Sequence, residues 1–124
     1  MKQEIKTSLA PLPVASYSQG IKVGNTVYVA GQGPLNVQTG VVPDGAAAQT
    51  SQVLTNIKNI LEAGGASMDD VVKVTVHLQD LADFQEFNQV YQEFFSTPYP
   101  VRTTVQSGLN NILVEIDVIA VISE

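Results

Sequence analysis

Cysteine is absent from this chain of 124 residues, and histidine occurs once, as His77. Without cysteine, disulfides, thiolate zinc sites and cysteine nucleophiles are excluded. A single histidine excludes a metal site built from several histidines of one chain, and no nucleophile elbow accompanies it that would indicate a Ser-His-Asp hydrolase. We therefore expect His77 to be an exposed or interfacial strand residue rather than a catalytic base.

Charged residues are also scarce, at 15% of the chain against about 25% in typical globular proteins. Six basic and twelve acidic side chains leave a net charge of −6. Nucleic-acid binding normally needs a basic patch that displaces counterions from phosphate, and anionic membrane surfaces are disfavoured for the same reason. Neither nucleic acid nor membrane is therefore an expected partner. The low charge density of so small a chain predicts instead that another subunit covers part of its surface.

Long hydrophobic runs are missing too, since none approaches the 18 or so residues that a membrane helix needs. The opening residues Met1–Ile5 lack the apolar core of a signal peptide. A cytoplasmic protein of one domain, residues 1–124, is the expectation.

The hydrophobic patterns that are present predict an α+β fold with one mixed β-sheet. The opening segment through Pro13 is expected to be a surface arm or a short edge strand, and 41–42 is a candidate for another short strand. A two-residue turn at Gly24-Asn25 predicts a hairpin. The other expected strands lie at 17–23, 26–31, 71–78, 101–106 and 113–122, and the expected helices at about 45–63 and 83–95.

Side-chain periodicity assigns faces to these elements. The first helix should bury one stripe: Ala46, Thr50, Val53, Ile57, Ile60 and Leu61. The strand at 71–78 should point Val72, Val74, Val76 and Leu78 one way and Lys73, Thr75 and His77 the other. The second helix carries an aromatic stripe that Asn88 interrupts with an amide: Phe84, Phe87, Tyr91, Phe94 and Phe95.

Two helices can cover only one face of this sheet, so the other face needs a different cover. The last strand has an apolar row from Val114 to Ile122, and its opposite row runs from Glu115 and Asp117 to apolar residues. A strand that is apolar on both faces near its end indicates burial on both sides. We expect subunits to pack sheet to sheet in a closed symmetric ring, with Lys73 at a subunit contact.

Arg102 is the first candidate for chemistry, because it lies within a strand pattern and shares one face with Thr104 and Gln106. A partly buried guanidinium needs an anionic partner. One interpretation is a salt bridge to Glu115 or Asp117 on the last strand, taken as its paired neighbour. The other is bidentate capture of a ligand carboxylate, which the planar guanidinium suits.

Glu115 is the second candidate, since a carboxylate between Val114 and Ile116 could hold and polarise a water molecule. Glu115 could also pair with Arg102, and its two oxygens allow both roles. The turn from Ala30 through Gly31 to Pro34 lets backbone approach a ligand closely, although it could equally be a plain strand end. Tyr17 could stack over a cleft or belong to the core, and Asn88 could contact a ligand or bond to backbone.

Several short motifs resemble those of the RidA/YjgF family, at the spacings that the family shows, from about residue 9 to residue 122. The motifs are Tyr17-Ser18-Gln19-Gly20, Gly31-Gln32-x-Pro34-Leu35, Thr39-Gly40, Gln49-Thr50-x-Gln52-Val53-Leu54-x-Asn56, Asp70-Val71-Val72-Lys73-Val74-Thr75-Val76, Phe87-Asn88-x-Val90-Tyr91 and Val114-Glu115-Ile116. The resemblance implies a chorismate-mutase-like fold and a homotrimer whose sheets form a central barrel, with ligand sites in the clefts between subunits.

The resemblance also implies an activity, because typical members are enamine/imine deaminases. They hydrolyse 2-iminobutanoate and 2-iminopropanoate, released by pyridoxal-phosphate dehydratases, to 2-oxo acids and ammonia. By this resemblance Arg102 binds the substrate carboxylate and Glu115 is associated with the attacking water. The cleft is then lined by Tyr17, Ala30, Gly31, Asn88 and Thr104. No metal or organic cofactor is expected, because an iminium carbon is already electrophilic.

The chain departs from the family pattern at a few positions. Ala30 stands where the family often has Ser, and Thr104 where it often has Cys. The turn at 106–113 is shorter than usual and lacks a Leu-Pro-Lys element. Besides deamination of small 2-imino acids, two alternatives follow: a noncatalytic trimer that binds small carboxylates such as 2-oxo acids, and a deaminase of a larger, aminomuconate-like enamine acid. Ribonuclease activity, sometimes attributed to relatives, fits poorly with the net charge and the single histidine.

Overall fold

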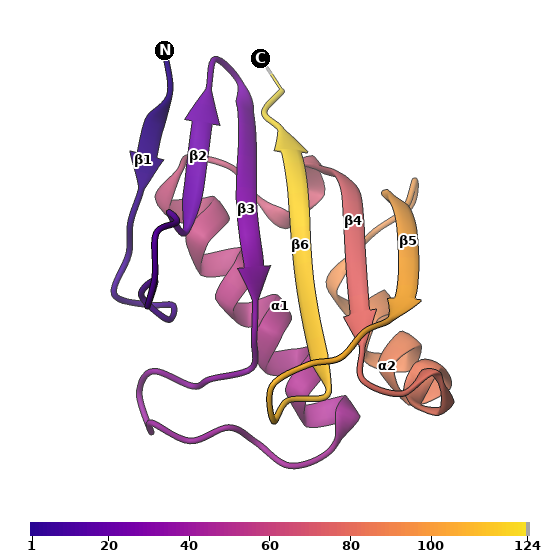
Figure 1. Ribbon diagram of the computed structural model, residues 1–124. Coiled ribbons are helices and arrows are strands. Elements are labelled where there is room, and N and C mark those ends of the chain that lie inside the picture. The colour runs from indigo at the N-terminus through magenta and orange to yellow at the C-terminus, as the bar shows by residue number, and fades with distance from the viewer. Residues whose placement is uncertain (124) are drawn as a thin grey trace.

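The computed structural model describes residues 1–123 and confirms an α+β fold with one six-stranded sheet (Figure 1). Glu124, the last residue of the expected domain, lies outside the described residues. The elements are β1 (Gln3–Ile5), β2 (Gly20–Val23), β3 (Thr26–Gln32), α1 (Ala46–Ala63), β4 (Val71–Leu78), α2 (Phe84–Tyr91), β5 (Val101–Gln106) and β6 (Val114–Val121). Three one-turn 3₁₀ helices, Met68–Asp70, Leu81–Asp83 and Gln92–Phe94, lie before β4 and on either side of α2.

The strands lie in the order β1-β2-β3-β6-β4-β5. Every neighbouring pair is antiparallel except β4 and β5, which are parallel. A parallel pair needs a crossover connection, and α2 with its flanking turns supplies it. As a result β5 is an edge strand, and β6, the last in the chain, lies between β3 and β4.

Both helices cover the same face of the sheet, as the sequence predicts (Figure 1). The predicted stripe of α1 is buried, and Leu54 joins it in the core. From the sheet, the core receives alternate residues of β6, which are Val114, Ile116, Val118 and Ala120. The helix ends at Gly64-Gly65, where Gly65 has a φ of 84° that only glycine adopts readily.

One face assignment is wrong, at the start of β4. Val72 was expected to point inward with Val74, but Val71 is buried and Val72 is 44% exposed. The pairing explains this, because Val71 lies opposite Ala120 while Lys73 lies opposite Ile119, with a register shift between them. A bulge of this kind adds one residue to a strand and reverses its alternation on one side.

Two element predictions also need correction. The second helix ends at Tyr91 and continues as the 3₁₀ turn Gln92–Phe94, rather than as α-helix to Phe95. The candidate strand at 41–42 is reduced to an isolated bridge between Asn36 and Val41. The expected edge strand in the opening segment is present as β1.

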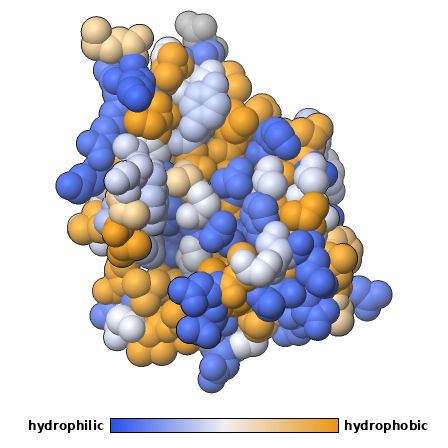
Figure 2. All heavy atoms as spheres, viewed as in Figure 1, coloured by the Kyte–Doolittle hydropathy of each residue, from blue (hydrophilic) through white to orange (hydrophobic). Residues whose placement is uncertain are grey.

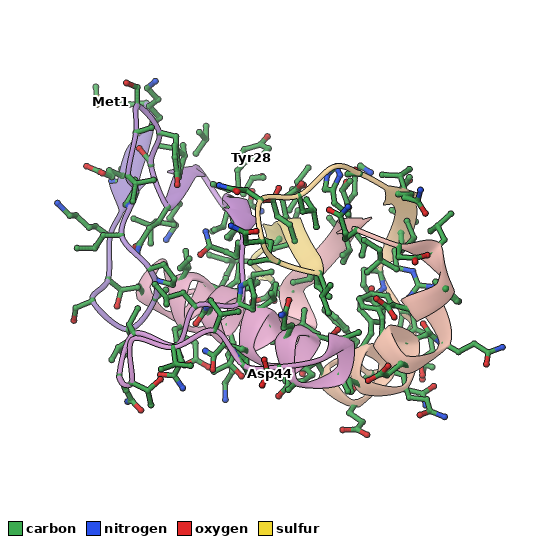
Figure 3. The ribbon with its side chains drawn as sticks, turned by 60° about the horizontal axis from the view of Figure 1, so that its bottom comes forward. Met1, Tyr28 and Asp44 are labelled. Carbon is green, nitrogen blue, oxygen red and sulfur yellow. The ribbon has the colours of Figure 1, made fainter. Side chains whose placement is uncertain are left out.

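The face of the sheet away from the helices is open in the protomer. Figure 2 looks onto this side and shows hydrophobic side chains interspersed with hydrophilic ones. Tyr28, which points away from the helices in Figure 3, is 47% exposed, and Val101 and Val105 of β5 are 66% and 39% exposed. The described chain therefore leaves uncovered the face that was expected to lie between subunits.

Candidate functional site

Arg102 lies on the helical side of the sheet, at its β5 edge. The parallel register places Arg102 beside Val74, whose side chain is buried under the helices. There the half-buried guanidinium meets α2, and its Nη1 donates a hydrogen bond of 2.7 Å to Asn88 Oδ1. The sequence named both residues as candidates, and the structure brings them together.

Three aromatic rings of α2 form a platform for this guanidinium. Arg102 Cζ lies 5.3 Å from the ring centroid of Phe84, 5.7 Å from that of Phe87 and 4.7 Å from that of Tyr91. A cation over an aromatic face is attracted by the ring quadrupole without losing its charge. The platform therefore holds the guanidinium in place and leaves its charge uncancelled.

The salt bridge considered for Arg102 is not formed. Among residues 1–123, its hydrogen-bond partner is the neutral amide of Asn88. The topology shows why Glu115 cannot serve, because β4 lies between β5 and β6. Glu115 also pairs with His77, and so lies on the face of the sheet opposite to Arg102. The expectation that β5 pairs with the last strand is therefore wrong.

A hollow of about 360 Å³ opens beside the guanidinium. The residues that line it come from α2, from the turn after it and from the start of β5: Asn88, Tyr91, Gln92, Tyr99, Pro100 and Arg102. A concave site with one cation, no carboxylate and several neutral polar side chains in its lining is suited to a small anion. A carboxylate is the best geometric match, because the guanidinium can donate to both of its oxygens.

Two buried hydroxyls near Arg102 have no hydrogen-bond partner: those of Tyr91 and Thr104. Thr104 is two residues after Arg102 on the same face of β5, as the sequence predicts. Burial raises the pKa of the Tyr91 hydroxyl, and the nearby Arg102 charge partly opposes that rise. Tyr91 was not among the candidate site residues, although its place beside Asn88 in the aromatic stripe was a usable signal.

Glu115 and Gly31 lie together on the open face of the sheet. A Cβ atom on Gly31 would stand 2.8 Å from Glu115 Oε2, which is closer than such atoms approach. Glycine at position 31 therefore lets the carboxylate lie directly against the β3 backbone. The half-buried side chain of Glu115 is free to hold a water molecule at this place.

Tyr17 and Ala30 border a second hollow, of about 440 Å³, beside β2 and β3. Tyr28 lines the same hollow, and the exposed ring of Tyr17 is available for stacking. The candidate residues thus form two groups. The first group, on the helical side of the sheet, contains Arg102, Asn88 and Thr104. The second group lies away from the helices: Glu115 and Gly31 are on the open face, and Tyr17 and Ala30 border the second hollow.

His77 and its neighbours form a polar centre on the open face. His77 Nδ1 lies 2.7 Å from Ser107 Oγ, and Glu115 is its cross-strand partner. Burial raises the pKa of the Asp117 carboxyl, while His77 and the exposed Lys73 partly oppose this. His77 and Lys73 lie on β4, as expected, and the place of Lys73 at a subunit contact stays a prediction.

Residues 1–123 contain no group of three or more His, Asp or Glu side chains that could hold a metal ion. In the same part of the chain, no helix combines the length and the hydropathy that crossing a membrane requires. The expected cytoplasmic location stays a prediction.

Comparison with known proteins gives this chain close relatives of nearly equal length. A family model described as Endoribonuclease L-PSP matches residues 7–122. A RutC family protein of Pyrococcus abyssi is 48% identical, with 96% of each chain covered. The 2-iminobutanoate/2-iminopropanoate deaminase of Escherichia coli K12 is 40% identical, with 98% of each covered.

Solved structures agree with these relatives. RidA from an Antarctic Psychrobacter species has a TM-score of 0.92 and 46% identity, covering 97% of this chain and 99% of that one. Escherichia coli TdcF with bound serine has a TM-score of 0.91 and 37% identity, covering 98% and 99%.

Proposed function

Because the chain belongs to the Endoribonuclease L-PSP family, which includes the RidA and YjgF proteins, we propose that it is an imine deaminase. Its proposed substrates are small 2-imino acids such as 2-iminobutanoate and 2-iminopropanoate, which it hydrolyses to 2-oxo acids and ammonia. Two relatives that carry this activity in their names are 44% and 40% identical to it. The observation that carries the proposal is a guanidinium that bonds to a neutral amide, has no carboxylate partner among the described residues and lies beside a hollow.

In the proposed reaction Arg102 grips the substrate carboxylate with two parallel N–H bonds. Thr104, whose buried hydroxyl lacks a partner, donates to the same ligand. Asn88 holds the guanidinium from the α2 side. These contacts fix the acid end of the substrate and leave its C=N bond to be attacked.

Glu115 supplies the water in this proposal. It takes a proton as the water oxygen bonds to the carbon of the iminium, which gives an amino alcohol, and it then returns this proton to the nitrogen. The C–N bond breaks and ammonia leaves as the hydroxyl passes its own proton to Glu115 and becomes the ketone oxygen. Uncatalysed hydrolysis of an iminium is already fast, so orientation and proton transfer are the help that is needed. The backbone at Gly31 lies beside Glu115 and faces the same substrate.

Two protomers are needed to bring these groups together. Arg102 and Glu115 are on opposite faces of one sheet, so a single chain cannot present both to one small molecule. We propose that the site forms in a homotrimer, with Arg102 from one subunit and Glu115 from the next. The open, partly apolar sheet face would then be covered in a central barrel, which accounts for its exposed valines.

The alternatives use the same hollow in other ways. A noncatalytic trimer would bind 2-oxo acids through Arg102 without turnover. A larger enamine acid would use more of the 360 Å³ along Tyr99 and Gln92. The endoribonuclease name of the family is less well supported by this chain, because a net charge of −6 and a single half-buried cation in the hollow offer little to a phosphate backbone.

The test is to generate 2-iminopropanoate in situ and to time its decay with the purified protein. We expect Arg102→Ala to lose about 10- to 100-fold in rate at low substrate, as removal of a charged hydrogen-bond donor costs. Arg102→Lys keeps the positive charge but lacks the two parallel N–H donors of the guanidinium, so it should recover little of the lost rate. Lys58→Ala removes an exposed cation from α1 and serves as the control with an unchanged rate.

One result would contradict the role of Arg102, and another would contradict the deaminase itself. If Arg102→Ala matches the wild type, the role of Arg102 is wrong. If 2-oxobutanoate binds the wild type and not Arg102→Ala, while neither protein accelerates imine decay, the noncatalytic binder is correct. A panel of imines of increasing chain length separates the larger substrate from the small one.

A further inference from the structure

The hydroxyl of Tyr91 is a polar group that the free protein leaves unused. Tyr91 is only 4% exposed, and its hydroxyl makes no hydrogen bond of good geometry, although Arg102 is close enough to act on it. Within residues 1–123, the one other buried side-chain polar atom in this condition is Thr104 Oγ1, which lies two residues from Arg102 on the same face of β5. Buried polar groups without partners are rare in native proteins and call for an explanation.

The Tyr91 ring is packed among aromatic neighbours and the Arg102 side chain. Its ring centroid lies 5.4 Å from that of Phe87 and 4.7 Å from that of Phe95. The Arg102 guanidinium covers the ring from another side, at 4.7 Å. A phenylalanine would fill this place in the core equally well, so packing alone does not explain the hydroxyl.

The nearby group with donors to spare is Arg102 itself. A guanidinium has five N–H donors, and Asn88 takes one of them, on Nη1. Arg102 already lines the hollow, and a guanidinium that grips a carboxylate with two parallel bonds still has N–H groups in need of an acceptor inside the protein.

We infer that Tyr91 is a positioning residue for Arg102: the hydroxyl oxygen of Tyr91 accepts an N–H of the guanidinium while other N–H groups bind the substrate carboxylate. The inference rests on the proposed role of Arg102 as the carboxylate receptor. Burial raises the pKa of Tyr91, which keeps the phenol protonated and neutral. It therefore orients the guanidinium without cancelling the charge that the substrate needs.

Tyr91→Phe tests this, because it keeps the aromatic platform and removes only the hydroxyl. We expect the KM for 2-iminopropanoate and the Kd for 2-oxobutanoate to rise about 10-fold, the effect of one hydrogen bond to a charged group. The kcat should change little, and the Tm should not fall, since the lost hydroxyl had no partner. A lower Tm with unchanged KM and Kd would show a merely structural role and overturn the inference.

A double-mutant cycle with Arg102→Lys asks whether Tyr91 acts through the guanidinium. We expect Tyr91→Phe to have no further effect on 2-oxobutanoate affinity in the Arg102→Lys protein. A full 10-fold effect there would mean that Tyr91 contacts the ligand directly, which overturns the positioning role. Thr55→Val is the control, because that hydroxyl bonds to Ser51 O within α1 and its loss should leave KM unchanged.

The same experiments separate this inference from the proposed function. If the wild type does not accelerate imine decay, the deaminase proposal itself fails, and if Arg102→Ala is as active as the wild type, the role of Arg102 fails. If Arg102 is required and Tyr91→Phe binds and turns over as the wild type does, the deaminase stands and the positioning role of Tyr91 is wrong.

Discussion

At Arg102 the neighbours are one amide and three aromatic rings, and both kinds of neighbour leave the positive charge uncancelled. A carboxylate in place of Asn88 would hold the guanidinium more strongly, but it would compete with any incoming acid. The neutral amide fixes the direction of the side chain at a smaller cost to its availability. Asn88 thus has a positioning role that its place on the α2 surface already permits.

Gly31 shows how a missing side chain sets the position of Glu115. We expect Gly31→Ala to displace Glu115, because the new Cβ would stand 2.8 Å from Glu115 Oε2. A shift of about 1 Å in a catalytic group can cost about 100-fold in rate, so imine decay should slow by that order while the fold is kept. The measurements are the rate and the Tm.

Gly108→Ala provides the matched control, since nothing lies within 4 Å of a Cβ at that position. It should leave both the rate and the Tm unchanged. A Gly31→Ala protein with wild-type activity would show that the position of Glu115 does not matter to the reaction.

At the scale of elements, the sequence predicts strands better than their irregularities. The bounds of β4 and β5 match the prediction, because β-branched runs there end at turn residues or proline. The outward turn of Val72 could not be predicted, since the bulge depends on how β4 pairs with β6. After Tyr91 the chain winds more tightly, as the 3₁₀ turn Gln92–Phe94. The hydrophobic periodicity of a single 3₁₀ turn differs too little from that of an α-helix to predict this change.

The candidate site divides in the same way. The sequence identified Asn88 because it interrupts an aromatic stripe, Arg102 because it is a cation within a strand pattern, and Thr104 because it shares the strand face of Arg102 and matches a family position. The hydrogen bond between Arg102 and Asn88 joins two elements, and no local pattern contains it. The opposite faces of Arg102 and Glu115 depend on strand order, which is why the salt bridge between them was wrongly considered.

Gln49 controls the short turn that leads into β6. Its Oε1 accepts from Leu113 N at 2.7 Å, and its Nε2 donates to Pro43 O at 3.0 Å. Because Gln49 is buried, Gln49→Met should leave both backbone groups unpaired and cost about 1–3 kcal/mol in the free energy of unfolding. Urea unfolding measures that loss, and amide exchange at Leu113 should become faster.

Gln89→Met is the control for this change, since Gln89 is exposed on α2. It should alter the free energy of unfolding by less than about 0.5 kcal/mol, as surface substitutions do. Equal stability of the two variants would show that the turn does not depend on Gln49.

At the scale of the molecule, the sheet divides the candidate residues and an assembly would reunite them. Arg102 faces the helices at the β5 edge, whereas Glu115 and Gly31 face the open side. The open side also carries exposed Tyr28, Val101 and Val105, which a monomer would leave in water. One arrangement answers both observations: a symmetric ring in which the open side of one protomer meets the site edge of the next.

Co-assembly of two inactive variants tests this arrangement directly. Arg102→Ala and Glu115→Gln, expressed together with different tags and purified through both, should each be inactive alone and regain activity in mixed trimers. A site needs Arg102 from one protomer and Glu115 from its neighbour, so each trimer that carries both tags has one complete site of three and should show about one third of the wild-type rate. As a control, Arg102→Ala is paired with the double variant Arg102→Ala/Glu115→Gln, which leaves no complete site and should restore no activity. If the doubly tagged Arg102→Ala and Glu115→Gln complex stays inactive, the two groups do not meet across a subunit boundary, because a shared site would have reappeared in it.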